Sequence, residues 1–114
     1  MRLITFEKDG RPVLGVRRKD DLVDLSVAAP WLAHILVQLL AGGSAAMVQI
    51  KTAVGMAPSR AIIPLEEITY LPPVTHPSKI ICLGLNYAEH AAESRLEKPP
   101  CPVLFARFDT TLVG

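Results

Sequence analysis

The stretch LITFEKDGRPVLGVRRKDDLVDL, residues 3–25, decides the fold of the front of this chain. Three short apolar runs alternate in it with two polar clusters. Asp9-Gly10 in the first cluster is a hairpin signal, because the tight turn needs a positive φ that glycine adopts without a steric penalty. The charged cluster at 17–21 predicts a solvated turn. Residues 2–26 are therefore expected to form a three-stranded antiparallel meander.

Helical spacing follows the meander. Pro30 suits a first helical turn, and the apolar residues behind it recur at intervals of three and four: Leu32, Ile35, Leu36, Leu39 and Leu40. The apolar run at 31–41 is too short to span a membrane and predicts a buried core helix. Gly42-Gly43 supply a stop, and Ser44 is expected to cap a second helix that ends before Pro58.

Prolines close this first region. Residues 61–64 and 68–70 indicate edge strands, since a proline removes one donor from a strand ladder. Pro72, Pro73 and Pro77 then force an extended, semi-rigid connection. The sequence predicts a small α+β domain over residues 1–71 and a proline-rich linker over 72–78.

The remaining residues follow a different pattern. Residues 79–85 and 103–108 are apolar on both faces, as in strands covered on both sides. Asn86 is expected to cap a short helix over 87–95. These elements cannot cover each other, and a segment of about 36 residues rarely folds alone. We interpret residues 79–114 as the truncated start of a larger, β-rich domain.

Composition excludes several classes of protein. The chain has 114 residues, is 50% hydrophobic and carries a formal net charge of +1. This apolar content argues against disorder, and the charge argues against a nucleic-acid binder. The N-terminus lacks the long apolar stretch of a signal peptide. Cys82 and Cys101 are most simply reduced thiols, so a cytoplasmic protein is expected, although a disulfide between them stays open.

One group of residues could carry chemistry. His90 and Glu93 follow a predicted buried strand and share one face of a helix. A carboxylate beside an imidazole raises its basicity, which is how a general base for water is built. An ordinary ion pair on a solvated helix has the same spacing. The spacing alone leaves both interpretations open and favours the ordinary pair.

Other polar residues are less informative. Arg107 interrupts an apolar strand face, so it meets either a carboxylate or an anionic ligand. His34 is expected in the core or at its boundary, and His76 in solvent. The sequence contains no glycine-rich phosphate loop, no nucleophile elbow and no Cys or His cluster with metal-ligand spacing.

The order Gly-Leu-Asn-Tyr-x-x-His-x-x-Glu over residues 84–93 resembles the fumarylacetoacetate hydrolase family. Residues 102–108 and 112–114 are similar to the next strand and loop of that family. The Leu-Gly-Val at 14–16, the Val-Asp-Leu-Ser at 23–26 and the Leu-Pro-Pro-Val at 71–74 resemble the small N-terminal domain of many bacterial members. The resemblance thus covers the whole chain.

The resemblance implies a fold and a function. Family members place a small domain before a mixed, β-rich catalytic domain and bind a divalent cation, commonly magnesium, manganese or calcium. They hydrolyse a carbon–carbon bond of 2-oxo or 1,3-dicarbonyl acids, or decarboxylate or isomerise related acids. Such reactions occur in the catabolism of aromatic compounds. Carried over, His90 is the general base, Glu93 its orienting partner, and Tyr87 and Arg107 bind substrate. A homo-oligomer, such as a dimer, is expected.

Two departures from the family pattern matter. Many members carry lysine where this chain has Arg107, so only a substrate-facing or anion-pairing role is transferred. The acidic metal ligands of the family lie downstream of Gly114, and no set of carboxylates in these residues replaces them. We therefore expect no bound cofactor and little activity from this portion. The alternative is a non-catalytic folding or oligomerisation module. Neither interpretation involves nucleic acid or a membrane.

Overall fold

The computed structural model describes residues 1–84 and 101–113. These residues form strands, α-helices and short 3-10 turns, so the predicted α+β class is confirmed. The chain divides into two compact units, one built from Met1–Thr75 together with Val113 and one from His76–Leu112. The division falls between Thr75 and His76, inside the expected linker at 72–78.

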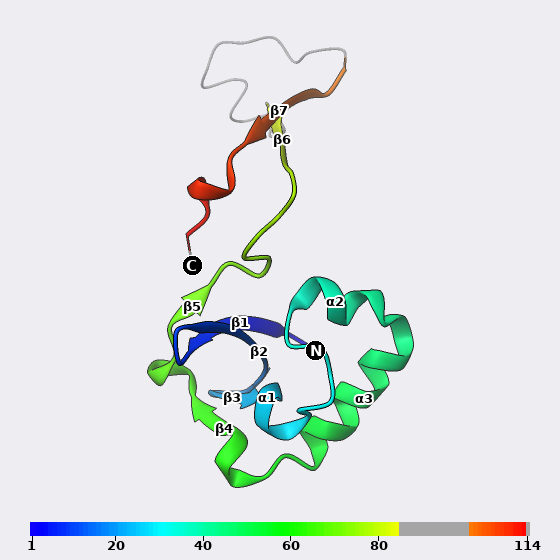
Figure 1. The fold of residues 1–114 in the computed structure, drawn as a ribbon, viewed down its shortest axis with the longest axis vertical. Helices are drawn as coiled ribbons and strands as arrows, with labels where there is room; N and C mark the ends of the chain where they lie inside the picture. Colours follow the sequence, from blue (N-terminus) through cyan, green and yellow to red (C-terminus); the bar gives the residue numbers. More distant parts are fainter. Residues whose placement is uncertain (85–100, 114) are drawn as a thin grey trace. The chain divides into compact units, whose positions relative to one another are not determined.

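The first unit is built on a five-stranded sheet with the order β4-β3-β2-β1-β5 (Figure 1). All its pairings are antiparallel. Its strands are β1 (Leu3–Lys8), β2 (Arg11–Arg18), β3 (Asp21–Asp24), β4 (Ile62–Pro64) and β5 (Tyr70–Leu71). The predicted meander forms its centre, and the two proline-flanked segments lie at its edges, as expected.

Both turns of the meander use left-handed backbone. Asp9 and Gly10 have φ values of 52° and 70°, which matches the turn that best fits the twist of a hairpin. Lys19 also has a positive φ, of 56°, in the turn between β2 and β3. Lysine is rare in this region, where Asn, Asp and Gly are preferred, so the second turn carries some backbone strain.

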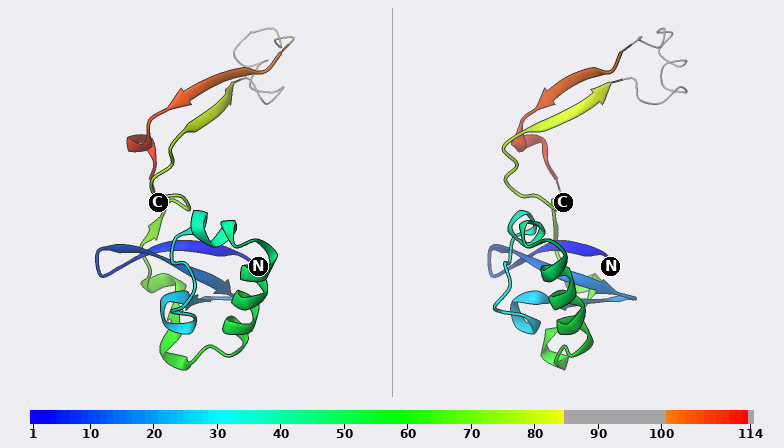
Figure 2. Two further views of the ribbon diagram at one scale, coloured as in Figure 1. Left: turned by 45° about the vertical axis from the view of Figure 1, so that its right-hand side comes forward. Right: turned by 90° about the vertical axis from the view of Figure 1, so that its right-hand side faces the viewer.

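The sheet is covered on both faces. On one face α1 (Leu25–Ala28), α2 (Leu36–Ala41) and α3 (Gly43–Gly55) pack on the meander (Figure 2). That cluster joins Leu14 and Val16 of β2 to Leu39, Ala46 and Ile50 of the helices. On the other face, Phe6, Val13 and Leu22 pack with partly buried residues from 63–68. This double cover explains why four consecutive residues of β2, 13–16, are all buried.

The helix expected from Pro30 begins later. Residues 30–35 form turns and bends, and α2 starts only at Leu36. The short helix α1 was not expected, because Leu25 continued an apolar run that indicated a strand. Asp24 explains it: an aspartate is a strong N-cap, and its side chain accepts a hydrogen bond from the Ser26 amide.

The prediction of a buried helix over 31–41 is wrong. Trp31, Val37 and Leu40 are 69%, 58% and 55% exposed, and within α2 only Leu39 is buried. A helix of six residues presents little more than one turn to the core, so most of its apolar side chains face away. The predicted cap is also wrong, since Gly42 precedes α3 and Ser44 lies within it.

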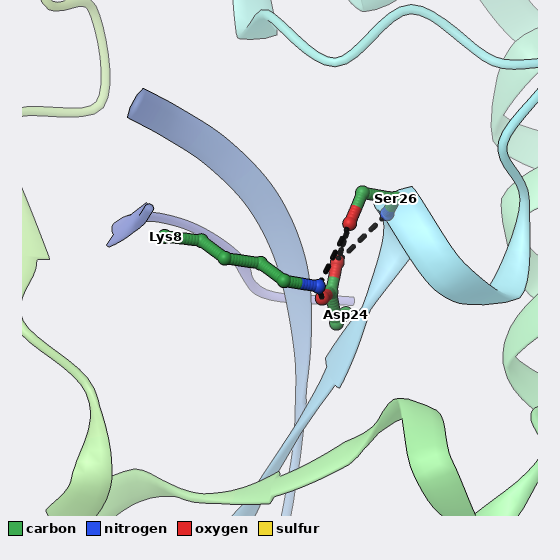
Figure 3. A network of polar contacts seen from close by, with 3 residues as sticks. All are labelled: Lys8, Asp24 and Ser26. Carbon is green, nitrogen blue, oxygen red and sulfur yellow. Dashed lines mark hydrogen bonds and ion pairs between the residues drawn. The ribbon is translucent and has the colours of Figure 1, made fainter. Parts of the chain in front are cut away.

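A buried carboxylate joins three elements of the first unit (Figure 3). Asp24 is 0% exposed. Its Oδ1 accepts from the Ser26 amide at 2.8 Å and from Ser26 Oγ at 2.6 Å. Its Oδ2 accepts from Lys8 Nζ at 2.5 Å. The end of β1 is thus tied to the end of β3 and to the start of α1.

The second unit contains β6 (Ile80–Gly84) and β7 (Val103–Arg107), paired antiparallel, and a 3-10 turn at Asp109–Thr111. Every residue of β7 is exposed, and β6 alternates between half-buried and exposed positions. The short helix expected over 87–95 lies outside the described residues. None of the helices within the described ranges has the length and apolar content of a segment that crosses a bilayer.

Replacing Asp24 by alanine should lower the free energy of unfolding by about 1–2 kcal/mol, because it removes the N-cap of α1 and leaves the Ser26 amide and hydroxyl without their acceptor. The matched control is Asp20→Ala in an exposed turn, which should change it by less than about 0.5 kcal/mol. Urea denaturation followed by circular dichroism measures both. Equal values for the two variants would contradict the role given to Asp24.

There is no room for a side chain at Gly15 of β2. A Cβ built there lies 2.6 Å from Leu22 Cδ1 and Cγ, and Leu22 is fully buried. Gly15→Ala should therefore cost about 1–3 kcal/mol through overpacking. Gly55→Ala is the control, since nothing lies within 4 Å of its Cβ position. A Gly15→Ala protein as stable as the Gly55→Ala protein in urea would refute this account of β2.

Candidate active site

The β6–β7 ladder borders the segment predicted to be catalytic. Tyr87, His90 and Glu93 lie in the interval 85–100, outside the described residues. The register pairs Gly84 at the end of β6 with Val103 at the start of β7. The residues on the two sides of the interval are therefore held next to each other by backbone pairing.

Arg107 stands on one face of this ladder. Residues directly opposite each other in an antiparallel pair share a face. Arg107 is opposite Ile80, and Phe105 is opposite Cys82, so these four side chains lie on the same face with Arg107 at its end. This face combines one permanent positive charge with apolar and aromatic surface, which suits a ligand with an anionic head and an apolar body.

Arg107 has a free guanidinium within the described ranges. The one ion pair formed by residues 1–84 and 101–113 joins Lys8 to Asp24, so no described carboxylate neutralises Arg107. The sequence left open a carboxylate partner or an anionic ligand for this residue. The described residues supply no carboxylate, and Arg107 is exposed and available to an anion.

The described part of the chain does not fit a metal ion. No group of three or more His, Cys, Asp or Glu residues within it is arranged to hold one. A hard divalent cation needs several oxygen atoms converging on one point. The divalent cation implied by the family resemblance therefore has no ligand set among residues 1–84 and 101–113.

The buried network of Lys8, Asp24 and Ser26 is structural rather than catalytic. Both carboxylate oxygens of Asp24 are already engaged, and the residue is fully buried. Ser26 Oγ donates to a carboxylate that no histidine contacts, so it lacks the arrangement that activates a serine. The network was missed at the sequence level, although Asp24 before a short apolar run is an N-cap signal.

The other candidate residues occupy ordinary positions. His34 is half-buried at the core boundary, as expected, and its Nδ1 is a buried atom without a hydrogen-bond partner in the described structure. His76 is exposed, again as expected. Cys82 and Cys101 are free thiols, the first partly buried and the second exposed.

Comparison with known proteins gives close relatives along the whole chain. No family model matches it. Oxaloacetate tautomerase Fahd2a, mitochondrial, of Rattus norvegicus is 36% identical over 118 residues, which cover all of this chain and 37% of that protein. Oxaloacetate tautomerase FAHD2A, mitochondrial, of Bos taurus is 33% identical over the same shares. The chain thus spans little more than a third of the length of these relatives.

Solved structures show the same fold. The crystal structure of a putative HpcE protein from Mycobacterium smegmatis matches with a TM-score of 0.74 and 30% identity, over 97% of this chain and 37% of that one. Fumarylacetoacetate hydrolase from Exiguobacterium antarcticum matches with a TM-score of 0.64 and 24% identity, over 96% of this chain and 36% of that one. The resemblance seen in the sequence is confirmed: the chain is similar along its whole length to proteins of the fumarylacetoacetate hydrolase family.

Proposed function

We propose that this chain is the N-terminal portion of a metal-dependent enzyme that acts on 2-oxo or 1,3-dicarbonyl acids. The reaction is hydrolysis of a carbon–carbon bond next to a carbonyl, as in acylpyruvates, or the related isomerisation. The observation that carries the proposal is the motif of residues 84–93, which follows β6 directly. Relatives named oxaloacetate tautomerases support the substrate class, since oxaloacetate is a 2-oxo acid.

His90 is the general base of this proposal and Glu93 orients it. A neutral imidazole with an ordinary pKa of about 6.5 accepts a proton at neutral pH. In hydrolysis the proton comes from the attacking water. In isomerisation of the keto form, the proton comes from the carbon next to the ketone and is delivered to the ketone oxygen, which gives the enol. The reverse reaction returns the proton from the enol oxygen to that carbon. The same base at the same place serves both reactions.

Arg107 and Tyr87 bind the substrate. The exposed guanidinium of Arg107 has no carboxylate partner within the described ranges, so it is available to a carboxylate of the acid. Phe105 shares its ladder face and gives apolar contact to the carbon skeleton. The arginine differs from the lysine of many relatives, and its planar fork favours two-point contact with a carboxylate.

The metal belongs to the complete enzyme. A divalent cation such as Mg²⁺, Mn²⁺ or Ca²⁺ would polarise the ketone and stabilise a developing enolate when bound. Since the described residues offer no ligand set, we propose that the 114-residue chain alone has little or no turnover. We also keep the cytoplasm as the proposed compartment, although the names of the mammalian relatives place those proteins in mitochondria.

A fusion protein tests this proposal. In it, residues 1–114 replace the matching segment of the bovine relative, and the rest of that relative is kept. With Mg²⁺ present, the fusion should convert the enol of oxaloacetate to the keto form or cleave acetylpyruvate. Either reaction is measured as a decrease in the ultraviolet absorption of the substrate. His90→Ala should lower kcat by about 10²–10⁴-fold, the usual contribution of a general base. Glu93→Gln should cause a smaller loss, because the base remains without its orienting partner.

Glu67→Gln is the matched control for Glu93→Gln, because Glu67 is an exposed carboxylate in the first unit. It should leave kcat unchanged. A His90→Ala fusion with native circular dichroism and full activity would overturn the role of His90. Robust turnover by the 114-residue chain alone, abolished by His90→Ala, would overturn its proposed inactivity.

A second candidate is a non-catalytic assembly module, and one observation favours it. The other face of the β6–β7 ladder carries only apolar side chains: Ile81, Leu83, Leu104 and Ala106. Of these, Ile81, Leu83 and Leu104 are 66%, 43% and 64% exposed. In this candidate two copies of the chain bury these faces against each other, which also fits the expected homo-oligomer.

Sedimentation of the 114-residue chain tests the second candidate. A stable dimer that Leu104→Lys converts to a monomer is expected, because a charge cannot be buried unpaired in an apolar interface. Val48→Lys is the control, since Val48 is similarly exposed, at 61%, on α3. A chain that remains monomeric at every concentration would exclude this candidate.

A further inference from the structure

A cationic hollow lies at the open end of the β1–β2 hairpin in the first unit. The described residues that line it are Met1, Arg2, Arg17 and Lys19, and its volume is about 480 Å³. Three of the four carry permanent or near-permanent positive charge, and none carries a negative one. Small-molecule sites have volumes of roughly 300–1,000 Å³. The hollow is wide and open to solvent, so it would hold an anionic molecule by charge and hydrogen bonds and not by enclosing it.

Arg2 and Arg17 face each other across the strand ladder. β1 and β2 pair Leu3 with Val16, and the next backbone bond, from the Arg17 amide to the Arg2 carbonyl, is 2.9 Å long. This bond continues the ladder by one position and makes the two arginines direct opposites. Side chains in that relation stand about 5 Å apart at Cβ, and like charges there are destabilising.

The third cation, Lys19, also lines the hollow and has an unusual backbone conformation. Lys19 adopts a φ of 56°, a conformation that costs a non-glycine residue free energy. Its carbonyl accepts a hydrogen bond of 3.0 Å from Arg17 Nε. That bond fixes the guanidinium through Nε and leaves its two terminal amino groups free to bind a ligand.

Asp20 follows Lys19 in the same turn, but no described ion pair joins it to any of the three cations, and the carboxylates paired in the strand ladders lie elsewhere. Asp21 lies opposite Arg18, and Arg18 alternates with Arg17, so that pair stands on the other face of β2. On its own face Arg17 is opposite Leu22, a fully buried core residue. Glu7 and Asp9 belong to the far end of the β1–β2 hairpin. Like charges gathered without a described counter-charge are a local conflict of the kind that marks binding sites.

We propose that Arg2, Arg17 and Lys19 form a binding site for a phosphate group carried by a small molecule. Guanidinium groups match the geometry of phosphate with paired hydrogen bonds, and lysine adds a point charge. A dianion compensates the repulsion between the opposed arginines better than a single charge does. The site lies entirely in the first unit and is independent of the enzymatic proposal for residues 84–107.

The probe is inorganic pyrophosphate, titrated into the ¹⁵N-labelled 114-residue chain at low ionic strength and followed by nuclear magnetic resonance. The amide signals of Arg2, Arg17 and Lys19 should shift in a saturable way, and the affinity should fall as salt is added. Citrate at the same concentration is the comparison, because it is a carboxylate of closely matched negative charge near neutral pH, and it should bind about tenfold more weakly.

Two variants report on the site. Arg17→Gln should weaken pyrophosphate binding by about tenfold or more, whereas Arg11→Gln makes the same charge change at the other end of β2 and should leave it unchanged. Lys19→Gly removes one cation and relieves the left-handed strain. It should therefore raise the melting temperature while weakening binding, so a loss of binding cannot be mistaken for unfolding.

Each outcome decides the proposal. Saturable binding that Arg17→Gln and Lys19→Gly weaken and Arg11→Gln spares supports it. Equal loss in Arg11→Gln would show only a diffuse attraction to net positive charge and would overturn the site. Citrate binding as tight as pyrophosphate would overturn the assignment to phosphate. No saturable shift at low salt would overturn the proposal as a whole.

Discussion

The buried carboxylate of Asp24 is the interaction on which the first unit depends. A fully desolvated charge is costly unless it is paired and hydrogen-bonded, and here both oxygens are engaged by Lys8 and Ser26. Because these partners come from the end of β1 and the start of α1, the carboxylate fixes how the meander turns into its first helix. The helices then cover one face of the sheet, and the chain of residues 63–68 covers the other.

Local signals predicted most of this fold. Asp9-Gly10 marked the first hairpin because only a few residue types adopt its backbone, and the prolines marked the edge strands because they lack a donor. The helices were harder. Apolar spacing over 31–41 indicated a buried helix, but Pro30 is followed by turns, and the six residues of α2 bury only Leu39. Periodicity reports which residues share a face, and not how much of that face another element covers.

The candidate site was predicted from order and type of residues rather than from geometry. The motif around His90 and Glu93 identified the family, and the relatives and solved structures agree with it. The placement of Arg107 on one ladder face with Phe105 follows only from the register of β6 and β7. The opposed pair of Arg2 and Arg17 is likewise invisible in the sequence, because it results from pairing between residues far apart in the chain.

The two units differ in the packing that stabilises their strands. The first has a core on both faces of its sheet, whereas an isolated two-stranded ladder with exposed apolar faces is marginal at best. Amide hydrogen exchange on the 114-residue chain tests this directly. We predict strong protection, approaching that of global unfolding, in β1, β2 and β3, and weak protection in β6 and β7. Equal, strong protection in both ladders would contradict this difference, because β6 and β7 would then need no further partner.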